Sequence, residues 1–173
     1  MTTYTAPIKD MSFVLNELVD LSEINRLPGI EELTPDLLES ILQASARFAG
    51  EVLAPLNRSG DLEGSILTDG GVKTPQGFKE AYRLYREGDW QSLPFEPEYG
   101  GQGLPILLAT VLNEMCLSAN LAWSLCMMIT EGAAITIKAH ATEEIKNLYL
   151  PRIVPGDWSG KKVLPVKSAL IFQ

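Results

Sequence analysis

The sequence has little of the two residue types that build most metal and disulfide sites. Its 173 residues include two cysteines and one histidine. Cys116 and Cys126 lie ten residues apart in one apolar stretch, where a helix would hold them about 15 Å apart, too far for a disulfide. We expect two free, buried thiols. We expect no metal site, because two cysteines and one histidine at this spacing do not form a zinc ligand set.

Basic residues are also scarce. The chain has 14 Lys and Arg against 22 Asp and Glu, a formal net charge of −8 at pH 7. An acidic chain gains nothing from counterion release on nucleic acid and is repelled by anionic lipid surfaces. We expect neither nucleic acid nor membrane among its partners.

Signals for export and for membrane insertion are missing as well. Residues 1–11 contain no basic region followed by an apolar run, so they do not read as a secretory signal. The longest uncharged apolar stretch, Met115 to Thr130, falls short of the ~20 residues that span a bilayer. With 46% hydrophobic and 21% charged residues, the composition is that of a globular protein. We expect one ordinary domain in the cytoplasm.

No segment shows the alternating pattern of a half-buried strand, so the predicted class is all-α. The pattern predicts a bundle of about five to six helices with an N-terminal helical arm and an irregular C-terminal tail. Thr34, Thr74 and Thr142 are suitable N-caps. The predicted helices cover residues 10–21, 34–54, 74–87, 105–118 and 120–139, and a last helix begins at Thr142 and is closed by Pro151 and Pro155-Gly156. Pro55 ends the second helix, and Gly88 ends the third, whose buried stripe is Phe78, Tyr82 and Tyr85. Residues 57–71 form a polar loop. The helices on either side of Ser118 to Asn120 are apolar on too many sides to be surface helices and belong in the core.

The segment Gly100-Gly101-Gln102-Gly103 invites comparison with a phosphate-binding loop. A true P-loop follows a strand and ends in Gly-Lys-Ser or Gly-Lys-Thr, whereas helices surround this segment and no lysine follows it. A turn that requires positive φ is the better interpretation.

The residues alone identify no catalytic side chain. His140 is placed to cap a helix C-terminus, and no Ser or Cys nucleophile has a recognisable partner. Glu114 and Glu131 interrupt the apolar helices, where exposure is the favoured interpretation over burial with a raised pKa. Met127 and Met128 beside Trp123 either pack in the core or line a pocket for a flexible acyl chain.

Several motifs then combine into one specific pattern. They are Glu98 to Gly103, Asn113-Glu114-Met115, Thr130 to Ala133, Thr142-Glu143-Glu144, Tyr149-Leu150-Pro151 and Pro155 to Trp158. In this order and spacing they resemble the N-terminal helical domain of acyl-CoA dehydrogenases, over Tyr4 to about Gly160. The opening Tyr4 to Pro7 and Asp10 to Leu15 resembles a bacterial subgroup with an extra N-terminal arm, which includes enzymes acting on 3-methylthiopropanoyl-CoA. The implied domains are residues 1–33, 34–160 and 161–173.

The resemblance implies FAD-dependent oxidation of the Cα–Cβ bond of an acyl-CoA thioester. In the family a glutamate removes the α proton and flavin N5 takes the β hydride, while the N-terminal helices wall one side of the acyl pocket. The matching pocket positions here are Ser124, Leu125, Met128 and Gly132. No cofactor-binding residue of this chain is identified.

The sequence departs from the family pattern after Gly160, where a β domain with flavin contacts would follow. Residues 161–173 instead read as a loosely held, non-family tail. The resemblance therefore implies a truncated chain, inactive alone and without tight FAD binding. Alternatives stay open: a non-enzymatic helical interaction module, a homo-oligomer, and one part of a split dehydrogenase that assembles with the missing domains.

Overall fold

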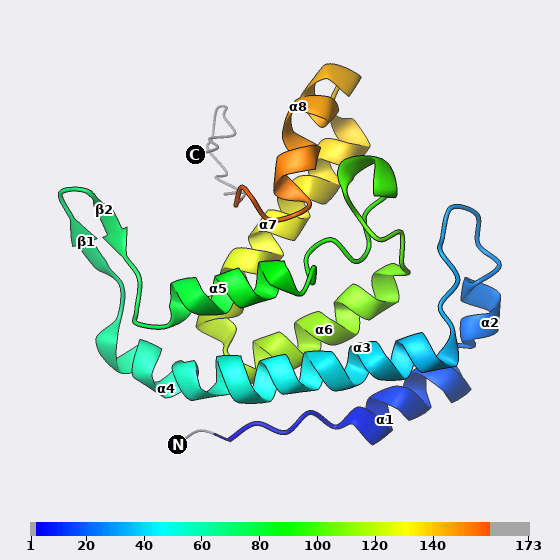
Figure 1. Cartoon of the computed structure of the whole chain (residues 1–173), viewed down its shortest axis with the longest axis horizontal. Helices are drawn as coiled ribbons and strands as arrows, with labels where there is room; N and C mark the ends of the chain where they lie inside the picture. The colour runs from blue at the N-terminus through cyan, green and yellow to red at the C-terminus, as the bar shows by residue number, and fades with distance from the viewer. Residues whose placement is uncertain (1–2, 160–173) are drawn as a thin grey trace.

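The computed structural model describes residues 3–159, and these residues are mostly helical (Figure 1). The helices are α1 (Ile8–Phe13), η1 (Val14–Leu18), α2 (Leu21–Ile24), α3 (Pro35–Arg47), η2 (Phe48–Leu53), α4 (Ala54–Glu63), α5 (Phe78–Glu87), η3 (Pro97–Tyr99), α6 (Ile106–Ala119), α7 (Leu121–His140) and α8 (Glu143–Ile153), and the strands are β1 (Ile66–Thr68) and β2 (Gly71–Lys73). The predicted helical class is confirmed. The predicted tail, residues 161–173, lies outside the described residues.

One long helical rod is formed by α3, η2 and α4 in direct succession. Thr34 caps it as predicted, with its Oγ1 accepting a hydrogen bond from the backbone N–H of Leu37 at 3.2 Å. The prediction that Pro55 ends this helix and that Asn57 begins a loop was wrong. Pro55 lies in the first turn of α4, directly after the π-helical turns of η2, where the hydrogen-bond register changes and a missing N–H is tolerated.

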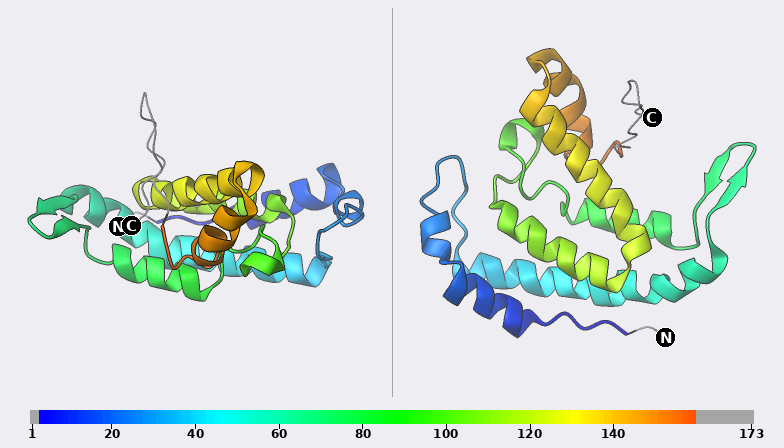
Figure 2. Two further views of the ribbon diagram at one scale, coloured as in Figure 1. Left: turned by 90° about the horizontal axis from the view of Figure 1, so that it is seen from above. Right: turned by 180° about the vertical axis from the view of Figure 1, so that it is seen from behind.

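A short β-hairpin follows the rod, although no strand was predicted. Its antiparallel register pairs Leu67 with Val72 across the two-residue turn Asp69-Gly70. Asp-Gly between apolar residues is a hairpin signal that outweighs the polar character of the surrounding segment. All six strand residues are exposed, and the hairpin projects from the helical body (Figures 1 and 2).

Helix α5 begins at Phe78 rather than at the predicted cap Thr74. Gly77, at φ +87°, is the residue before the helix, and a left-handed backbone there favours glycine. The predicted buried stripe holds, since Tyr85 is 4% exposed and its ring packs at 5.5 Å from that of Trp123. Gly88 ends α5 as predicted, with its N–H bonded to the carbonyl of Leu84.

The core is built on α6 and α7, as their apolar sequences predicted. Leu112 and Met115 of α6 are almost completely buried, and α7 packs against both α6 and α8. The predicted break is confirmed at Asn120, whose side chain accepts a hydrogen bond from the backbone N–H of Trp123. By length and composition alone, α7 is long and apolar enough to cross a membrane, and 39% of its most apolar window is buried. This helix extends beyond the uncharged stretch that ends at Thr130 and includes Glu131 and Lys138.

The last helix, α8, is capped by Thr142 as predicted. Pro151 lies inside this helix instead of ending it, and the helix ends after Ile153, before Pro155 and Gly156. Its inner face forms a second small core with the end of α7 and the segment around η3. This core contains Phe95, Tyr99, Ala134, Ile137, Leu150, Ile153 and Val154.

Candidate functional site

The four residues predicted to line an acyl pocket all lie on α7. Leu125 and Met128 are 46% and 41% exposed. Gly132 lies on the same face, two turns after Leu125 and one turn after Met128. Ser124 is buried, and its hydroxyl donates a hydrogen bond to the carbonyl of Asn120 at 2.8 Å. The structure thus brings Leu125, Met128 and Gly132 together on the surface and places Ser124 beneath them. Contact of these residues with a substrate stays a prediction.

These residues belong to a longer apolar surface that we call the α7 stripe. It comprises Leu121, Leu125, Met128, Ile129, Gly132 and Ile135. Leu121, Leu125, Met128, Gly132 and Ile135 follow each other at intervals of four, three, four and three residues, the spacing of a helix face that packs against another helix. A Cβ atom added at Gly132 would meet no atom within 4 Å. Contiguous exposed apolar residues of this kind mark contact sites.

The N-terminal end of the α7 stripe opens into a cavity of about 690 Å³. Leu121, Ala122 and Leu125 form one side of this cavity, and residues of α4 and of the hairpin base form the other. Arg58 and Asp61 on the α4 side are paired with each other at 3.0 Å. The stripe therefore continues into a hollow whose far wall carries charge.

A second cavity, which we call the α5–α7 cavity, measures about 520 Å³. It is lined by Ser65, Thr74, Phe78, Lys79, Tyr82, Ala122, Trp123, Cys126, Met127 and Ser159. Met127 is buried at its base, whereas Met128 is exposed on the α7 stripe. The two methionines that the sequence paired thus face different environments, because neighbouring residues on a helix point about 100° apart.

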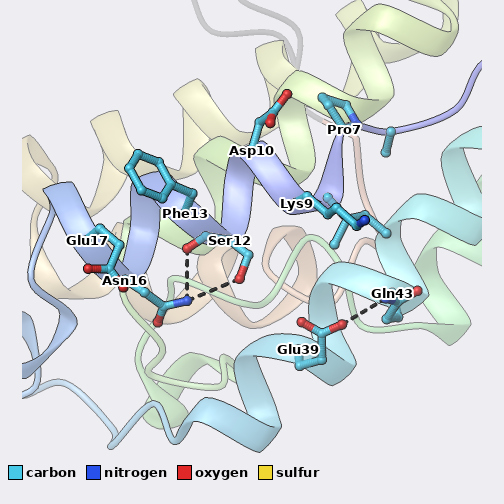
Figure 3. Close-up of a pocket in the computed structure, with 11 residues that line it drawn as sticks. Pro7, Lys9, Asp10, Ser12, Phe13, Asn16, Glu17, Glu39 and Gln43 are labelled. Atoms are coloured by element: carbon cyan, nitrogen blue, oxygen red, sulfur yellow. Dashed lines mark hydrogen bonds between the residues drawn. The ribbon is translucent and has the colours of Figure 1, made fainter.

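A third hollow, of about 840 Å³, lies between the arm and α3 (Figure 3). Its polar side chains bond within their own helices, with Asn16 donating to the carbonyl of Ser12 and Gln43 donating to Glu39, both at 2.8 Å. These bonds do not link the two walls. We interpret it as a groove between packed elements rather than a chemical site.

The acidic and imidazole side chains considered for catalysis have structural settings. Glu114 is exposed, as predicted. Glu131, for which exposure was also expected, is half-buried and accepts a hydrogen bond from Nδ2 of Asn113 at 2.9 Å. His140 is exposed in the last turn of α7, where a cation suits the helix dipole. Within residues 3–159, no three His, Cys, Asp or Glu side chains are grouped to hold a metal ion.

The two cysteines differ in exposure. Cys116 is buried in the core, and burial raises the pKa of its thiol to about 12. Cys126 is exposed at the α5–α7 cavity, so the prediction that both thiols are buried was wrong for this one. The apolar sequence around Cys126 suggested burial, but its position on α7 falls between the packed face and solvent.

The glycine loop before α6 is a structural turn, as predicted. Gly100 and Gly103 have φ of +85° and +68°, and a Cβ at Gly101 would lie 1.9 Å from the carbonyl oxygen of Phe95. The N–H groups of residues 100–103 all donate to backbone carbonyls, those of Pro97, Glu96, Ser92 and Phe95. A phosphate cradle needs free N–H groups, so this loop does not fit the pyrophosphate of a flavin dinucleotide.

Comparison with known proteins gives a consistent result. Residues 36–157 match the family model described as "Acyl-CoA dehydrogenase, N-terminal domain". The chain is 35% identical to 3-methylmercaptopropionyl-CoA dehydrogenase of Ruegeria pomeroyi over 158 residues, which cover 91% of this chain and 27% of that protein. It is also 25% and 22% identical to two butyryl-CoA dehydrogenases of Syntrophomonas wolfei, covering 91% and 96% of this chain and 26% and 28% of theirs.

The chain thus spans little more than a quarter of the length of these relatives. The matched region contains the long rod, the hairpin, the two core helices and the α7 stripe. It ends where the described structure ends, after α8. This chain belongs to the acyl-CoA dehydrogenase family, and its residues 36–157 are that family's N-terminal domain.

Proposed function

We propose that this chain forms the N-terminal helical wall of the acyl pocket in a flavin-dependent acyl-CoA dehydrogenase. The supporting observation is the α7 stripe: α7 exposes five large apolar side chains, whereas α3, α4 and α6 each expose one and α8 exposes two. Leu125, Met128 and Gly132 form the centre of this wall.

The role of these residues is to shape the pocket and exclude water. Met128 offers a flexible thioether that adapts to an acyl chain, and Gly132 leaves room beside it. Burial of the acyl chain against this wall contributes about 0.8 kcal/mol per methylene group. The flavin, when bound by the full-length protein, supplies the redox chemistry. Residues of this chain contribute position and a dry, apolar surface.

The flavin site and the catalytic base are proposed to come from polypeptide beyond these 173 residues, because the relatives are about four times as long. On this proposal, the chain by itself binds no FAD tightly and does not oxidise acyl-CoA. The test is to purify the chain, record its visible flavin absorbance and measure acyl-CoA-dependent reduction of an electron acceptor. Flavin retained through gel filtration together with turnover would refute this part of the proposal.

A chimera tests the wall directly. In it, this chain replaces the matching quarter of the Ruegeria pomeroyi enzyme. Met128→Phe is expected to lower kcat/KM for the acyl-CoA substrate by about tenfold, because a bulkier side chain narrows the pocket. The matched control is Leu148→Phe, at an exposed apolar position on α8 away from the stripe. Equal effects of the two substitutions would contradict the assignment of the wall.

The α7 stripe also supports a second candidate, a helical module whose function is to pack against another protein segment. The four-and-three spacing of its residues favours a helical partner. Light scattering separates the two candidates for the chain alone. A defined, concentration-dependent complex that Met128→Lys dissolves would favour the packing module, whereas a monomer at all concentrations would count against it.

A further inference from the structure

Trp123, Cys126 and Met127, which line the α5–α7 cavity, are rotated by about 100–160° from Leu125 and Met128, at about 100° per residue. The cavity adjoins the hollow at the N-terminal end of the stripe, with which it shares Ser65, Phe78 and Ala122. The acyl wall proposed above does not use this cavity. Its volume of about 520 Å³ lies within the range of small-molecule sites.

The base of the cavity is rigid. Trp123 is 4% exposed, its indole N–H donates to the carbonyl of Phe78 at 3.2 Å, and its ring packs edge-on against those of Phe48 and Tyr85. Beside it, the hydroxyl of Tyr82 donates to the carbonyl of Gly156 at 2.7 Å. Side chains held in this way are already ordered before a ligand arrives, so binding costs less conformational entropy.

The polar side chains of the lining are four hydroxyls, those of Ser65, Thr74, Tyr82 and Ser159, and the ammonium of Lys79. Thr74 Oγ1 is buried and has no hydrogen-bond partner among the described residues. Lys79 is the charged residue of the lining, and within residues 3–159 it forms no ion pair. A buried hydroxyl without a partner is costly. Because Thr74 Oγ1 has almost no accessible surface, a ligand that accepts its hydrogen bond removes this cost only when the Thr74 side chain turns toward the cavity. An ammonium and a hydroxyl beside an aromatic and thioether base together match an apolar molecule with one negatively charged oxygen group.

We propose that the α5–α7 cavity binds a small apolar carboxylate. The hydrocarbon or aromatic body lies against Trp123 and Met127, and the carboxylate lies at Lys79 and Thr74. Cys126 lies at the same cavity and is exposed, so a bound carboxylate covers its thiol.

Titration calorimetry of the 173-residue chain with naphthoate tests the site, and one-to-one binding is expected. Lys79→Gln is expected to weaken binding by about tenfold, the loss of one charge-assisted hydrogen bond. Lys9→Gln, on α1, is the matched control and leaves the affinity unchanged. The neutral analogue naphthamide is expected to bind the unmodified chain about tenfold more weakly than naphthoate, for the same reason.

Two further substitutions separate this cavity from the α7 stripe. Ala122→Phe fills the cavity from an exposed position and is expected to abolish binding, whereas Met128→Ala on the stripe leaves it unchanged. Circular dichroism checks that each variant is folded. The proposal would be overturned if Lys79→Gln and Ala122→Phe bound naphthoate as tightly as the unmodified chain does. It would also be overturned if Met128→Ala abolished binding.

A labelling experiment on the unmodified chain needs no substitution. Dithiodipyridine reacts with exposed Cys126 before buried Cys116. Saturating naphthoate is expected to slow the labelling of Cys126 by about fivefold or more, as a site with high occupancy protects its lining. An unchanged labelling rate would count against the cavity as the binding site. Because this cavity adjoins the hollow at the end of the stripe, the comparison with Met128→Ala distinguishes binding here from binding at the acyl wall.

Discussion

The side-chain amide of Asn120 donates a hydrogen bond to the backbone carbonyl of Leu53 at 3.2 Å. Both residues are completely or almost completely buried. The oxygen of the same amide accepts from the backbone N–H of Trp123 at 3.1 Å. One side chain therefore begins α7 and also fixes that beginning against the junction of η2 and α4. The direction of α7, and with it the position of the stripe, depends on this link.

Asn120→Ala is expected to lower the free energy of unfolding by about 2–4 kcal/mol. The substitution removes an N-cap, which costs about 1 kcal/mol, and leaves the buried carbonyl of Leu53 without this donor, which costs about 1–3 kcal/mol. Urea denaturation measures the change.

Asn120→Asp separates the two contributions. An aspartate keeps the oxygen that caps α7 but has no N–H to offer Leu53. Asn120→Asp is expected to lower the free energy of unfolding by at least as much as the unsatisfied Leu53 carbonyl alone would, because the aspartate also places a carboxylate in the core. If Asn120→Ala is as stable as the parent chain to within about 0.5 kcal/mol, the hydrogen bonds of the Asn120 side chain do not contribute to stability.

Gly101→Ala is expected to destabilise the fold strongly, by about 2 kcal/mol or more. The new Cβ would lie 1.9 Å from the carbonyl oxygen of Phe95, and both are backbone-held, so the loop before α6 would have to move. The matched control is Gly70→Ala in the hairpin turn, where a Cβ meets nothing within 4 Å. Thermal unfolding of the two variants compares them, and a similar melting temperature for both would contradict the steric argument.

The sequence was sufficient for the helical class and for several helix ends. Thr34, Asn120 and Thr142 were recognisable caps because their side chains bond to N–H groups only two or three residues away. The prediction from local propensity that Pro55 ends a helix was wrong. The π-helical turns before Pro55 change the pattern of backbone hydrogen bonds, and residue propensities do not predict that change. The hairpin was missed although its Asp69-Gly70 turn was visible.

The sequence predicted which residues form the candidate site but not which of the neighbouring α7 residues are buried. The family resemblance selected Ser124, Leu125, Met128 and Gly132, and in the structure Leu125 and Met128 are exposed, Gly132 is half-buried and Ser124 is buried. The resemblance could not show that Met127 turns inward to meet Tyr82 and Phe78, which come from a segment about 45 residues earlier. Contacts between distant segments decide which side of α7 is buried, and α7 is apolar on nearly every side. The α5–α7 cavity therefore has no signature in the sequence.

Gly132→Ala is expected to stabilise the chain by about 0.5–1 kcal/mol, because alanine is the better residue in a helix interior and nothing occupies the space of its Cβ. The matched control is Gly100→Ala, where the space is equally open but φ is +85°. There the left-handed backbone makes alanine unfavourable by about 1 kcal/mol. Melting temperatures that move in opposite directions are the expected result. A fall for Gly132→Ala would show that this face of α7 is covered in solution.

Cys116 gives the fold a dependence on alkaline pH. Burial raises the pKa of its thiol from 9.0 to about 12 in the folded chain. Above about pH 9 the thiol ionises in the unfolded chain but stays protonated in the folded one, so the unfolded state binds fewer protons and stability falls as pH rises toward 12. Buried Tyr85, whose pKa is also raised by burial, acts in the same direction above about pH 10.

Cys116→Ala isolates the contribution of the thiol. The substitution is expected to lower stability at about pH 8, because it leaves a small cavity, and to make the further loss between about pH 8 and pH 11 smaller than in the parent chain. Urea denaturation at the two pH values measures both effects. Cys126→Ala is the comparison: partial burial also raises the pKa of the Cys126 thiol, so its removal is expected to reduce the alkaline loss, but by less than Cys116→Ala does. If Cys116→Ala loses as much stability over this interval as the parent chain, the buried thiol is not the titrating group.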